Sequence, residues 1–381
     1  MKDRDGLRLK QDVVQAIEEQ HGKITFARFM ELILYHETEG YYQNDMQKLG
    51  KSGDFYTSAH IGSAMGQCVA AQLAEASRLM NVGGDPVTIV EWGGGDGRLA
   101  KAVLDELREA HASVYSRVAF MAVENSPLHR ERIRSALSEH ADVLIGISAA
   151  DEPVVADLLR NRKVLVFANE LLDAFPVHRL KWNQGEWKEI YVAWDEKTDA
   201  FDETLGPVAE PAAAAWLRER RIRGREGQVI EVNWPALDWI GSLGGNMREG
   251  FVMLIDYGDI TAELLAPHRM NGTLTCYRNH LASDNPYEYL GQQDMTAHVN
   301  FEWVMEKAAA AGFEQLLLRT QKQFLVDNGI LDRLRDHDGA DPFSETARSN
   351  RAIRQLLLSD GMSELFKVLT MQKRPYGKRR K

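Results

Sequence analysis

The stretch that decides the fold is Val87-Thr88-Ile89-Val90-Glu91-Trp92-Gly93-Gly94-Gly95-Asp96-Gly97. Its first five residues are mostly β-branched and predict a buried strand that ends at an acidic residue. The glycines that follow predict a tight turn, because glycine adopts positive φ and lets a backbone approach a ligand closely. Residues 99–110 then have helical periodicity, with their apolar residues on one face. A strand, a glycine turn and a helix N-terminus together predict a site for a nucleotide-like ligand.

The alternation of strands and helices continues beyond this turn. We expect further strands at 118–124, 143–147 and 163–168, with helices at 127–140 and 154–159 between them. Such alternation predicts an α/β fold with a parallel sheet covered on both faces. Helices are expected before it, at 7–20, 26–35 and 61–80, and the apolar residues Phe26, Phe29, Met30 and Ile33 are expected in the core.

The periodicity is less regular after residue 180. We expect strands at 187–192, 229–232, 251–255 and 314–319, a strand or turn at 272–277, helices at 211–223, 236–243 and 301–311, and a helical end at 344–371. The resulting organisation is an N-terminal helical segment and lid (1–82), a ligand-binding core (83–180), an inserted substrate-side α+β region (181–250), the remainder of the core sheet (251–325), and C-terminal helices with a basic tail (326–381).

Composition narrows the class of protein. The 381 residues include 46 basic and 56 acidic ones, for a formal net charge of −10, which disfavours a nucleic-acid partner. The two cysteines, Cys68 and Cys276, form no Cys-x-x-Cys motif, so we expect neither a disulfide framework nor a metal site. With no apolar signal core and no apolar run of about 20 residues, we expect a cytoplasmic protein without membrane insertion. The basic segment Lys373–Lys381 predicts a solvated tail or a weak docking tail.

Details of the glycine turn separate the candidate ligands. A dinucleotide fingerprint needs a small residue where this chain has Arg98, and it needs an acid about 20 residues further on, well before Glu124. The chain has no Gly-Lys-Ser/Thr, so an ATP-type P-loop is absent. The pattern Glu-x-Gly-x-Gly-x-Gly instead resembles the first motif of class I S-adenosylmethionine (SAM)-dependent methyltransferases.

This resemblance implies a Rossmann-like class I sheet and SAM as the cofactor. It implies that the turn carrying Glu91, Gly93, Gly95 and Gly97 passes under the methionine part of SAM. It also implies that Glu124, at the end of the next strand, binds the ribose hydroxyls, as a charged acceptor can do strongly. The alternative for Glu124 is a solvated strand end.

Several segments together resemble the MidA family, whose bacterial members are relatives of mitochondrial protein arginine methyltransferases that assist complex I assembly. They occur in the family's order over roughly residues 20 to 320: Ile24-Thr25-Phe26-Ala27-Arg28-Phe29-Met30, Glu39-Gly40-Tyr41-Tyr42, Gly53-Asp54-Phe55-Tyr56-Thr57-Ser58, the stretch from Ala168 to His178, Ile255-Asp256-Tyr257-Gly258, Gly272-Thr273-Leu274, and the stretch from Asp294 to Phe301. The resemblance implies a protein substrate, methylated on an arginine side chain.

The chain departs from the family pattern at three places. Ala59-His60 follows Thr57-Ser58 where the family usually has Pro-Glu, Leu290-Gly291 replaces Pro-Gly, and Asp259 replaces a histidine. We expect these changes to bear on the substrate more than on the fold.

An arginine substrate sets a chemical requirement. Its guanidinium is protonated, with a pKa above about 12, and carboxylates orient it through bidentate hydrogen bonds. Glu170 and Asp173 follow the expected strand 163–168, at the sheet edge where ligands bind in open α/β folds. We hypothesise that Glu170 and Asp173 hold the guanidinium, with Asn169 beside them. The alternative is that all three residues cap the next helix.

Five further residues have a functional and a structural interpretation. Asp54 could reach the amino group of SAM from a lid loop, and Thr57 could contact SAM or only cap a helix. Asp256 could be a substrate carboxylate or a strand-end polar residue. His178 and His298 could assist proton removal or be packed polar residues.

Four functional hypotheses follow. The leading one is a SAM-dependent protein arginine methyltransferase, and the second is a SAM-binding assembly factor or chaperone without turnover. The third is a methyltransferase for a small molecule or RNA, and the fourth, disfavoured by Arg98 and by the position of Glu124, is a nicotinamide-dependent dehydrogenase. The irregular middle region and the C-terminal helices predict either a broad substrate surface or a homodimer contact.

Overall fold

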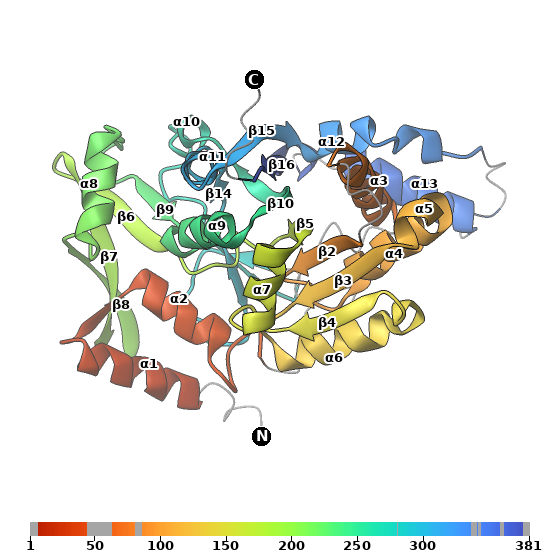
Figure 1. Ribbon diagram of the computed structural model, residues 1–381. Coiled ribbons are helices and arrows are strands. Elements are labelled where there is room, and N and C mark those ends of the chain that lie inside the picture. The colour runs from red at the N-terminus through yellow and green to blue at the C-terminus, as the bar shows by residue number, and fades with distance from the viewer. Residues whose placement is uncertain are drawn as a thin grey trace. The chain divides into compact units, whose positions relative to one another are not determined.

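The computed structural model in Figure 1 describes residues 7–43, 63–80, 86–279, 281–336, 341, 344–358 and 362–375. The chain divides into two compact units, which are described separately. The first unit comprises Met1–Phe55, Leu172–Trp239 and Gly258–Val304; the second comprises Tyr56–Leu171, Ile240–Tyr257 and Met305–Lys381.

An eight-stranded sheet has the order β15-β16-β10-β5-β2-β3-β4, with β14 pairing the end of β10. Apart from β14 and the last two residues of β10, the sheet belongs to the second unit. Its strands are β2 (Val87–Trp92), β3 (Val118–Val123), β4 (Leu144–Ser148), β5 (Lys163–Asn169), β10 (Glu249–Asp259), β14 (Val299–Asn300), β15 (Phe313–Thr320) and β16 (Phe366–Lys373). Strands β10, β5, β2, β3 and β4 are parallel, as predicted. The fold is the predicted Rossmann-like class I α/β sheet.

The strand order indicates where on the sheet a ligand would bind. From β2 the chain moves to β3 and β4 on one side, and then crosses to β5 and β10 on the other. The order therefore reverses between β2 and β5. In open α/β sheets, ligands bind outside the carboxyl ends of the strands at such a reversal. The glycine turn follows β2 and Glu170 follows β5, so both sequence candidates lie at this edge.

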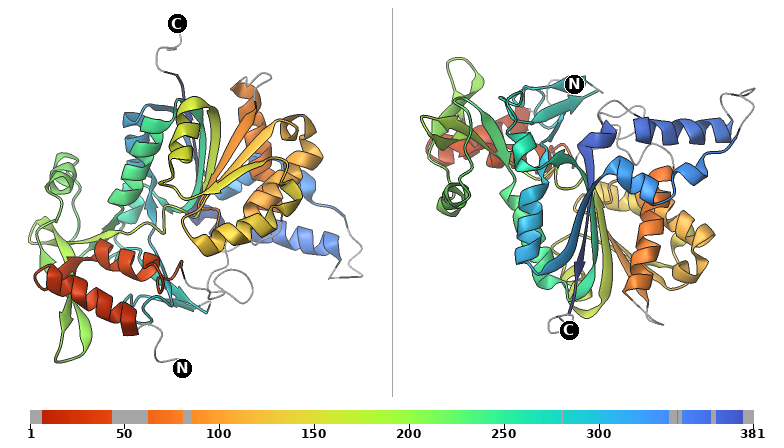
Figure 2. Two further views of the ribbon diagram at one scale, coloured as in Figure 1. Left: turned by 60° about the horizontal axis from the view of Figure 1, so that its bottom comes forward. Right: turned by 90° about the horizontal axis from the view of Figure 1, so that it is seen from above.

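Helices cover both faces of this sheet (Figure 2, right). Those of the second unit are α3 (Ala64–Leu79), α4 (Arg98–Ala110), α5 (Ala112–Tyr115), α6 (Pro127–Ala136), η2 (Ser138–His140), α7 (Pro153–Asn161), α12 (Gln321–Asp327), η3 (Leu331–Arg333), α13 (Glu345–Leu358) and α14 (Met362–Leu365), with most of α9 (Trp234–Asn246) and α11 (Phe301–Ala310). The small residues of α3 allow close packing, because a Cβ at Gly66 would lie 2.4 Å from the Cβ of Ala102 on α4.

The prediction of a helical end at 344–371 is wrong from residue 366 onward. Residues 366–373 form β16, which pairs antiparallel with both β10 and β15, so the sheet is mixed rather than wholly parallel. The central residues Val368, Leu369 and Met371 are fully buried. A short apolar run of this kind fits a buried helix or a buried strand, and its place between two strands decides the outcome.

The first unit contains two antiparallel sheets. A five-stranded sheet has the order β1-β7-β6-β9, with β8 on β7, and a three-stranded sheet has the order β12-β11-β13. The elements are α1 (Leu7–Glu19), β1 (Lys23–Thr25), α2 (Phe26–Tyr35), β6 (His178–Asn183), β7 (Glu186–Asp195), β8 (Ala200–Gly206), α8 (Pro211–Glu219), β9 (Val229–Val232), α10 (Thr261–Leu264), β11 (Thr275–Arg278), β12 (Leu281–Ser283) and β13 (Asp294–Thr296). Of these strands, the sequence predicted β7 and β9, and it left β11 open as a strand or turn.

The core of the first unit forms around α2. Phe26, Phe29, Met30 and Ile33 are at most 1% exposed, which confirms the predicted apolar stripe. They pack in one cluster with α1 and with Cys276 and Met295 of the three-stranded sheet. Thr25 caps α2, because its hydroxyl accepts a hydrogen bond from the backbone N–H of Arg28 over 3.2 Å.

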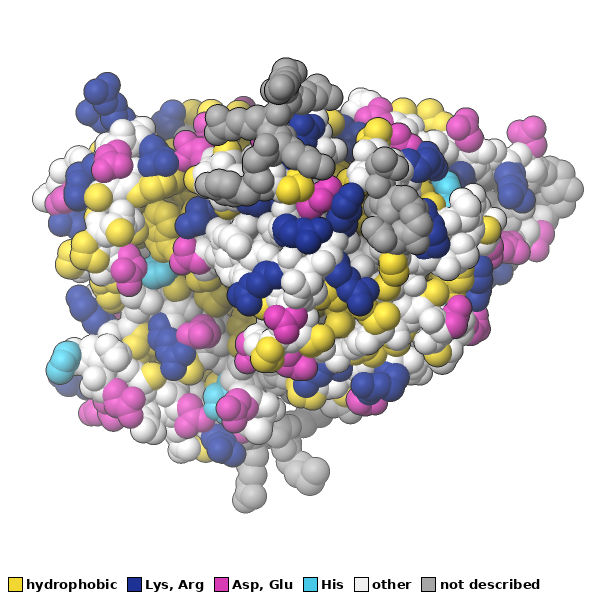
Figure 3. Space-filling model, in the orientation of Figure 1, with side chains coloured by type: hydrophobic (Ala, Val, Ile, Leu, Met, Phe, Trp, Pro, Cys, Tyr) yellow, Lys and Arg dark blue, Asp and Glu magenta, His cyan; other side chains and the backbone are white. Residues whose placement is uncertain are grey.

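Two surface properties bear on function. Among the described residues, none of the helices is both long enough and apolar enough to cross a membrane. Acidic and basic side chains are interspersed over the face that Figure 3 shows.

Candidate active site

The glycine turn has the backbone geometry that its sequence predicted. Gly93, Gly95 and Gly97 have φ values of +74°, +54° and +79°, which favour glycine. Gly97 is the N-cap of α4 and contributes no side-chain cap, and the N–H of Arg98, the first residue of this helix, donates to Oδ1 of Asp96 over 3.2 Å. At Gly94 a Cβ would lie 2.8 Å from Oε2 of Glu91, so the turn also needs a residue without a side chain there.

Glu124 is bonded to the turn. Its Oε2 accepts a hydrogen bond from the N–H of Gly95 over 3.0 Å, and its Oε1 accepts one from the N–H of Ser126 over 2.8 Å. Burial raises the pKa of this carboxyl, while the N–H groups of Ser126 and Gly95 lower it in part. The N–H of Asn125 also bonds this carboxylate, and since a carboxylate has about four acceptor sites, Glu124 keeps capacity for a ligand hydroxyl.

Glu91 is a buried acid at the end of β2, with only 2% of its surface exposed. Among the described residues, its Oε2 has no hydrogen-bond partner. Burial raises the pKa of Glu91 well above its ordinary value, and the charges of Glu124 and Asp96 raise it further. A cationic ligand would compensate this carboxylate. The site therefore fits a ligand that carries both a positive charge and a ribose, as SAM does.

Glu170 has an unusual backbone conformation. It follows β5 with φ +51°, a conformation that few non-glycine residues adopt. Its N–H donates to the carbonyl of Ile255 over 2.8 Å, and its Oε1 accepts a hydrogen bond from Nδ2 of Asn169 over 3.0 Å. Strained residues of this type persist where the surroundings fix them, and they cluster at functional sites.

The helix-capping alternative for these residues is wrong. Residues 170–177 form turns and extended chain, and the next element is β6, a strand. Asn169, Glu170 and Asp173 therefore have no following helix to cap.

Asp173 lies in the first unit, in a turn that is held firmly in place. Nδ2 of Asn233 donates to the carbonyl of Leu172 over 2.7 Å, the hydroxyl of Tyr35 donates to that of Ala174 over 2.8 Å, and the N–H of Ala297 donates to that of Asp173 over 3.2 Å. Asp173 itself is 3% exposed. The turn thus fixes a buried carboxyl group against the end of β13.

The remaining sequence candidates have other surroundings. Asp54 and Thr57 lie outside the described residues. Asp256 is buried within β10 rather than at its end, and its Oδ1 accepts from the N–H of Tyr257. Nδ1 of His178 lies 2.6 Å from Oε1 of Glu189, which is fully buried, so His178 fits the packed-residue interpretation.

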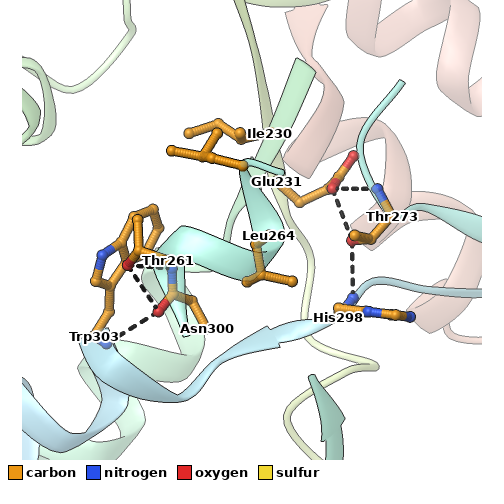
Figure 4. Close-up of a pocket in the computed structure, with 9 residues that line it drawn as sticks. Ile230, Glu231, Thr261, Leu264, Thr273, His298, Asn300 and Trp303 are labelled. Atoms are coloured by element: carbon orange, nitrogen blue, oxygen red, sulfur yellow. Dashed lines mark hydrogen bonds between the residues drawn. The ribbon is translucent and has the colours of Figure 1, made fainter. Parts of the chain in front are cut away.

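His298 lines a small pocket in the first unit (Figure 4). The carboxylate of Glu231 accepts from both the N–H and the hydroxyl of Thr273, whose hydroxyl in turn accepts from the N–H of His298. On the other side, Asn300 bonds Thr261. The cavity leaves about 10 Å³, which is room for one water. This pocket is therefore too small for a substrate side chain.

Two further candidate residues, Asn233 and Tyr42, could not be identified from the sequence. Asn233 holds the Asp173 turn, and nothing in its sequence surroundings distinguishes it. The hydroxyl of Tyr42 donates to Oδ1 of Asp294 over 2.7 Å. Tyr42 and Asp294 lie in segments that carry the MidA resemblance, but nothing in the sequence indicates that they pair.

Comparisons with known proteins support SAM as the cofactor. Residues 68–318 match the model of a family described as S-adenosyl-L-methionine-dependent methyltransferases. A protein from Burkholderia thailandensis, crystallised with S-adenosyl-homocysteine, is 29% identical and superposes with a TM-score of 0.86 over 97% of this chain and 93% of that one.

Relatives with named activities are more distant. The mitochondrial protein arginine methyltransferase NDUFAF7 of Mus musculus is 27% identical over 82% of this chain and 72% of its own length. The Drosophila melanogaster homologue of NDUFAF7 is 26% identical over 76% of this chain and 68% of its own length.

Proposed function

Because the chain belongs to this family of SAM-dependent methyltransferases, the MidA family, we propose that it methylates arginine side chains of a protein substrate. The names of the relatives from Mus musculus and Drosophila melanogaster support this choice of acceptor. The observation that carries the proposal is Glu170, a strained acidic residue at the carboxyl end of β5, at the reversal of strand order.

The residues of the glycine turn would bind and orient the cofactor. SAM supplies a methyl group on a sulfonium, which is an excellent leaving group. Glu91 would face the positively charged part, Glu124 would accept hydrogen bonds from the ribose hydroxyls, and the turn at Gly93 to Gly97 would allow close approach. With such a leaving group, alignment is the main task that remains for the protein.

Glu170 would align the acceptor. A guanidinium offers N–H donors in a plane, and a carboxylate accepts two of them at once. Asn169 fixes one oxygen of Glu170 through a hydrogen bond, so the carboxylate is oriented before the substrate arrives. When the nitrogen gains the methyl group it loses one proton, which would pass to the carboxylate of Glu170 or to solvent, and Glu170 would stabilise the positive charge that the guanidinium retains.

A direct assay tests the proposal. The purified protein is incubated with SAM labelled on the methyl group and with three otherwise identical blocked peptides, which contain arginine, lysine or citrulline. We expect label on the arginine peptide alone, as monomethylarginine by mass spectrometry. Transfer to lysine would reject the acceptor class. Tight SAM binding without transfer to peptides or to fractionated cell protein would instead favour a SAM-binding assembly factor without turnover.

A further inference from the structure

The three-stranded sheet β12-β11-β13 has two unlike faces. Cys276 of β11 and Met295 of β13 are direct cross-strand partners, and both pack into the core around α2. Side chains alternate along a strand and cross-strand partners share a face, so Tyr277 and its partner Asp294 lie on the opposite face. Thr275 and its partner Thr296 lie there too. This second face is polar.

The polar face is nevertheless largely buried. Asp294 is 6% exposed and Thr296 is 3% exposed. Among the described residues, the hydroxyl of Thr296 has no hydrogen-bond partner. Buried hydroxyls are nearly always paired in folded proteins, so this one indicates a donor that arrives with a ligand.

A second carboxylate lies beside the same face. The N–H of Ala297, which follows β13, donates to the carbonyl of Asp173 and so brings the Asp173 turn to the strand end. The charges of Asp173 and Asp294 both raise the pKa of Tyr42 and that of Tyr277, after burial. Both acids are thus close to the same two phenols.

Tyr42 holds Asp294 in place. Its hydroxyl donates to Oδ1 of Asp294 over 2.7 Å, and its ring packs at 5.3 Å from that of Tyr35. The approach of the two segments requires a glycine at 291, where φ is +69° and a Cβ would lie 2.3 Å from the carbonyl of Glu39. The position of Asp294 is therefore built into the fold.

Asp173 and Asp294 are both buried, and the backbone bond from Ala297 brings them to the same strand, so a cation bound by both would offset the cost of burying their charges. A guanidinium suits this place better than an ammonium does, because it is planar, more weakly hydrated and has five N–H donors for acceptors on several sides. We propose that Asp294, positioned by Tyr42, binds the guanidinium of the substrate together with Asp173, and that the Thr296 hydroxyl accepts one of its N–H groups. This inference rests on the proposed arginine acceptor.

Binding of blocked Gly-Gly-Arg-Gly-Gly and of its citrulline counterpart tests the inference by calorimetry, on protein saturated with S-adenosylhomocysteine. We expect the arginine peptide to bind and the citrulline peptide not to bind. Asp294→Asn should weaken binding of the arginine peptide by about 10- to 100-fold, as expected for loss of one charged hydrogen-bond partner. Asp284→Asn, which removes the same charge from an exposed residue after β12, should leave binding unchanged.

Two further variants keep the test informative should Asp294→Asn fold poorly. Thr296→Val removes a buried hydroxyl that has no partner in the described part of the chain, so it should raise the melting temperature while weakening peptide binding. Tyr42→Phe should raise KM for the peptide and leave kcat intact at saturation, because Tyr42 only positions Asp294.

The outcomes distinguish the two proposals. Arginine-selective binding that needs Asp294, without any methyl transfer, would support this inference and reject the proposed reaction. Methyl transfer that needs Glu170 but is unchanged in KM by Asp294→Asn and by Thr296→Val would reject this inference and retain the reaction. Equal binding of the arginine and citrulline peptides to the wild-type protein also overturns it.

Discussion

The backbone N–H of Gly95 donates a hydrogen bond to Oε2 of Glu124 over 3.0 Å, which joins the glycine turn after β2 to the acid after β3. The two residues, which we expected at the methionine part and at the ribose of one ligand, are thus fixed relative to each other within a single unit. The turn cannot shift without moving the acid.

Gly95→Val should abolish SAM binding. Valine is a genuine outlier at the φ of +54° found here, and the strain would displace the N–H that bonds Glu124. Gly185→Val is the matched control, because Gly185 has φ +87° in the β6–β7 hairpin with open space around it. Calorimetry should show SAM binding in the control and none in Gly95→Val; equal affinity in both variants would contradict the assignment of the turn.

Glu124→Gln should weaken SAM binding by about 10- to 100-fold, because a neutral amide replaces a charged acceptor worth about 1.5–3 kcal/mol per hydrogen bond. Glu131→Gln, on the exposed side of α6, removes the same charge and should bind SAM as the wild type does. A ligand without ribose hydroxyls should bind both proteins equally. Undiminished SAM affinity in Glu124→Gln would reject the ribose role.

Glu91 makes SAM affinity dependent on pH. Its pKa is raised by burial, so in the ligand-free protein the carboxyl stays protonated above its ordinary range, and a cationic ligand favours the ionised form. SAM affinity should therefore fall as the pH is lowered through the raised pKa, with proton release on binding at the lower pH. Calorimetry in two buffers of different ionisation enthalpy measures that release.

The raised pKa of Glu91 also makes the stability of the ligand-free protein depend on pH. This stability falls as the pH rises, whereas SAM affinity falls as the pH is lowered. A carboxyl whose folded-state pKa lies above its unfolded value contributes stability below the unfolded pKa and loses it as the pH rises through the folded pKa. Glu91→Gln should therefore raise the melting temperature of the ligand-free protein at neutral pH and also weaken SAM binding. Glu109→Gln, exposed on α4, should do neither. A lower melting temperature for Glu91→Gln would contradict this account.

Asn233→Asp separates two roles of one side chain. The Oδ1 atom accepts from the N–H of Ala236 and caps α9, and aspartate keeps this bond. Loss of the Nδ2 donor leaves the carbonyl of Leu172 unpaired, which should cost about 1–3 kcal/mol. Denaturant unfolding measures this loss. The peptide KM should rise as the Asp173 turn loosens, whereas SAM affinity should not change.

The parallel core could be predicted from the sequence, because its strands are short apolar runs that alternate with helices. β2 and β5 were predicted to within one or two residues. The strand β16 could not be distinguished from a helix, because its apolar run is short and its pairing partner β10 lies far away in the chain.

The geometry of the glycine turn was predictable for a similar reason, because the turn and Glu124 belong to consecutive elements. The contacts of the residues proposed to bind the substrate were not predictable. Tyr42 and Asp294 are separated by 252 residues, and only the folded chain brings them together. The backbone strain at Glu170 was also invisible, because the sequence equally suited a helix cap.

The most direct test of the central claim compares the wild-type protein with Glu170→Gln, using methyl-labelled SAM and the arginine peptide. Glutamine is isosteric with glutamate but cannot supply the charge that holds a guanidinium. We predict loss of methyl transfer by at least about 100-fold in Glu170→Gln with unchanged SAM affinity, since several charged hydrogen bonds to the substrate would be weakened. Full transfer by Glu170→Gln, or no methylarginine from the wild-type protein, would contradict the account.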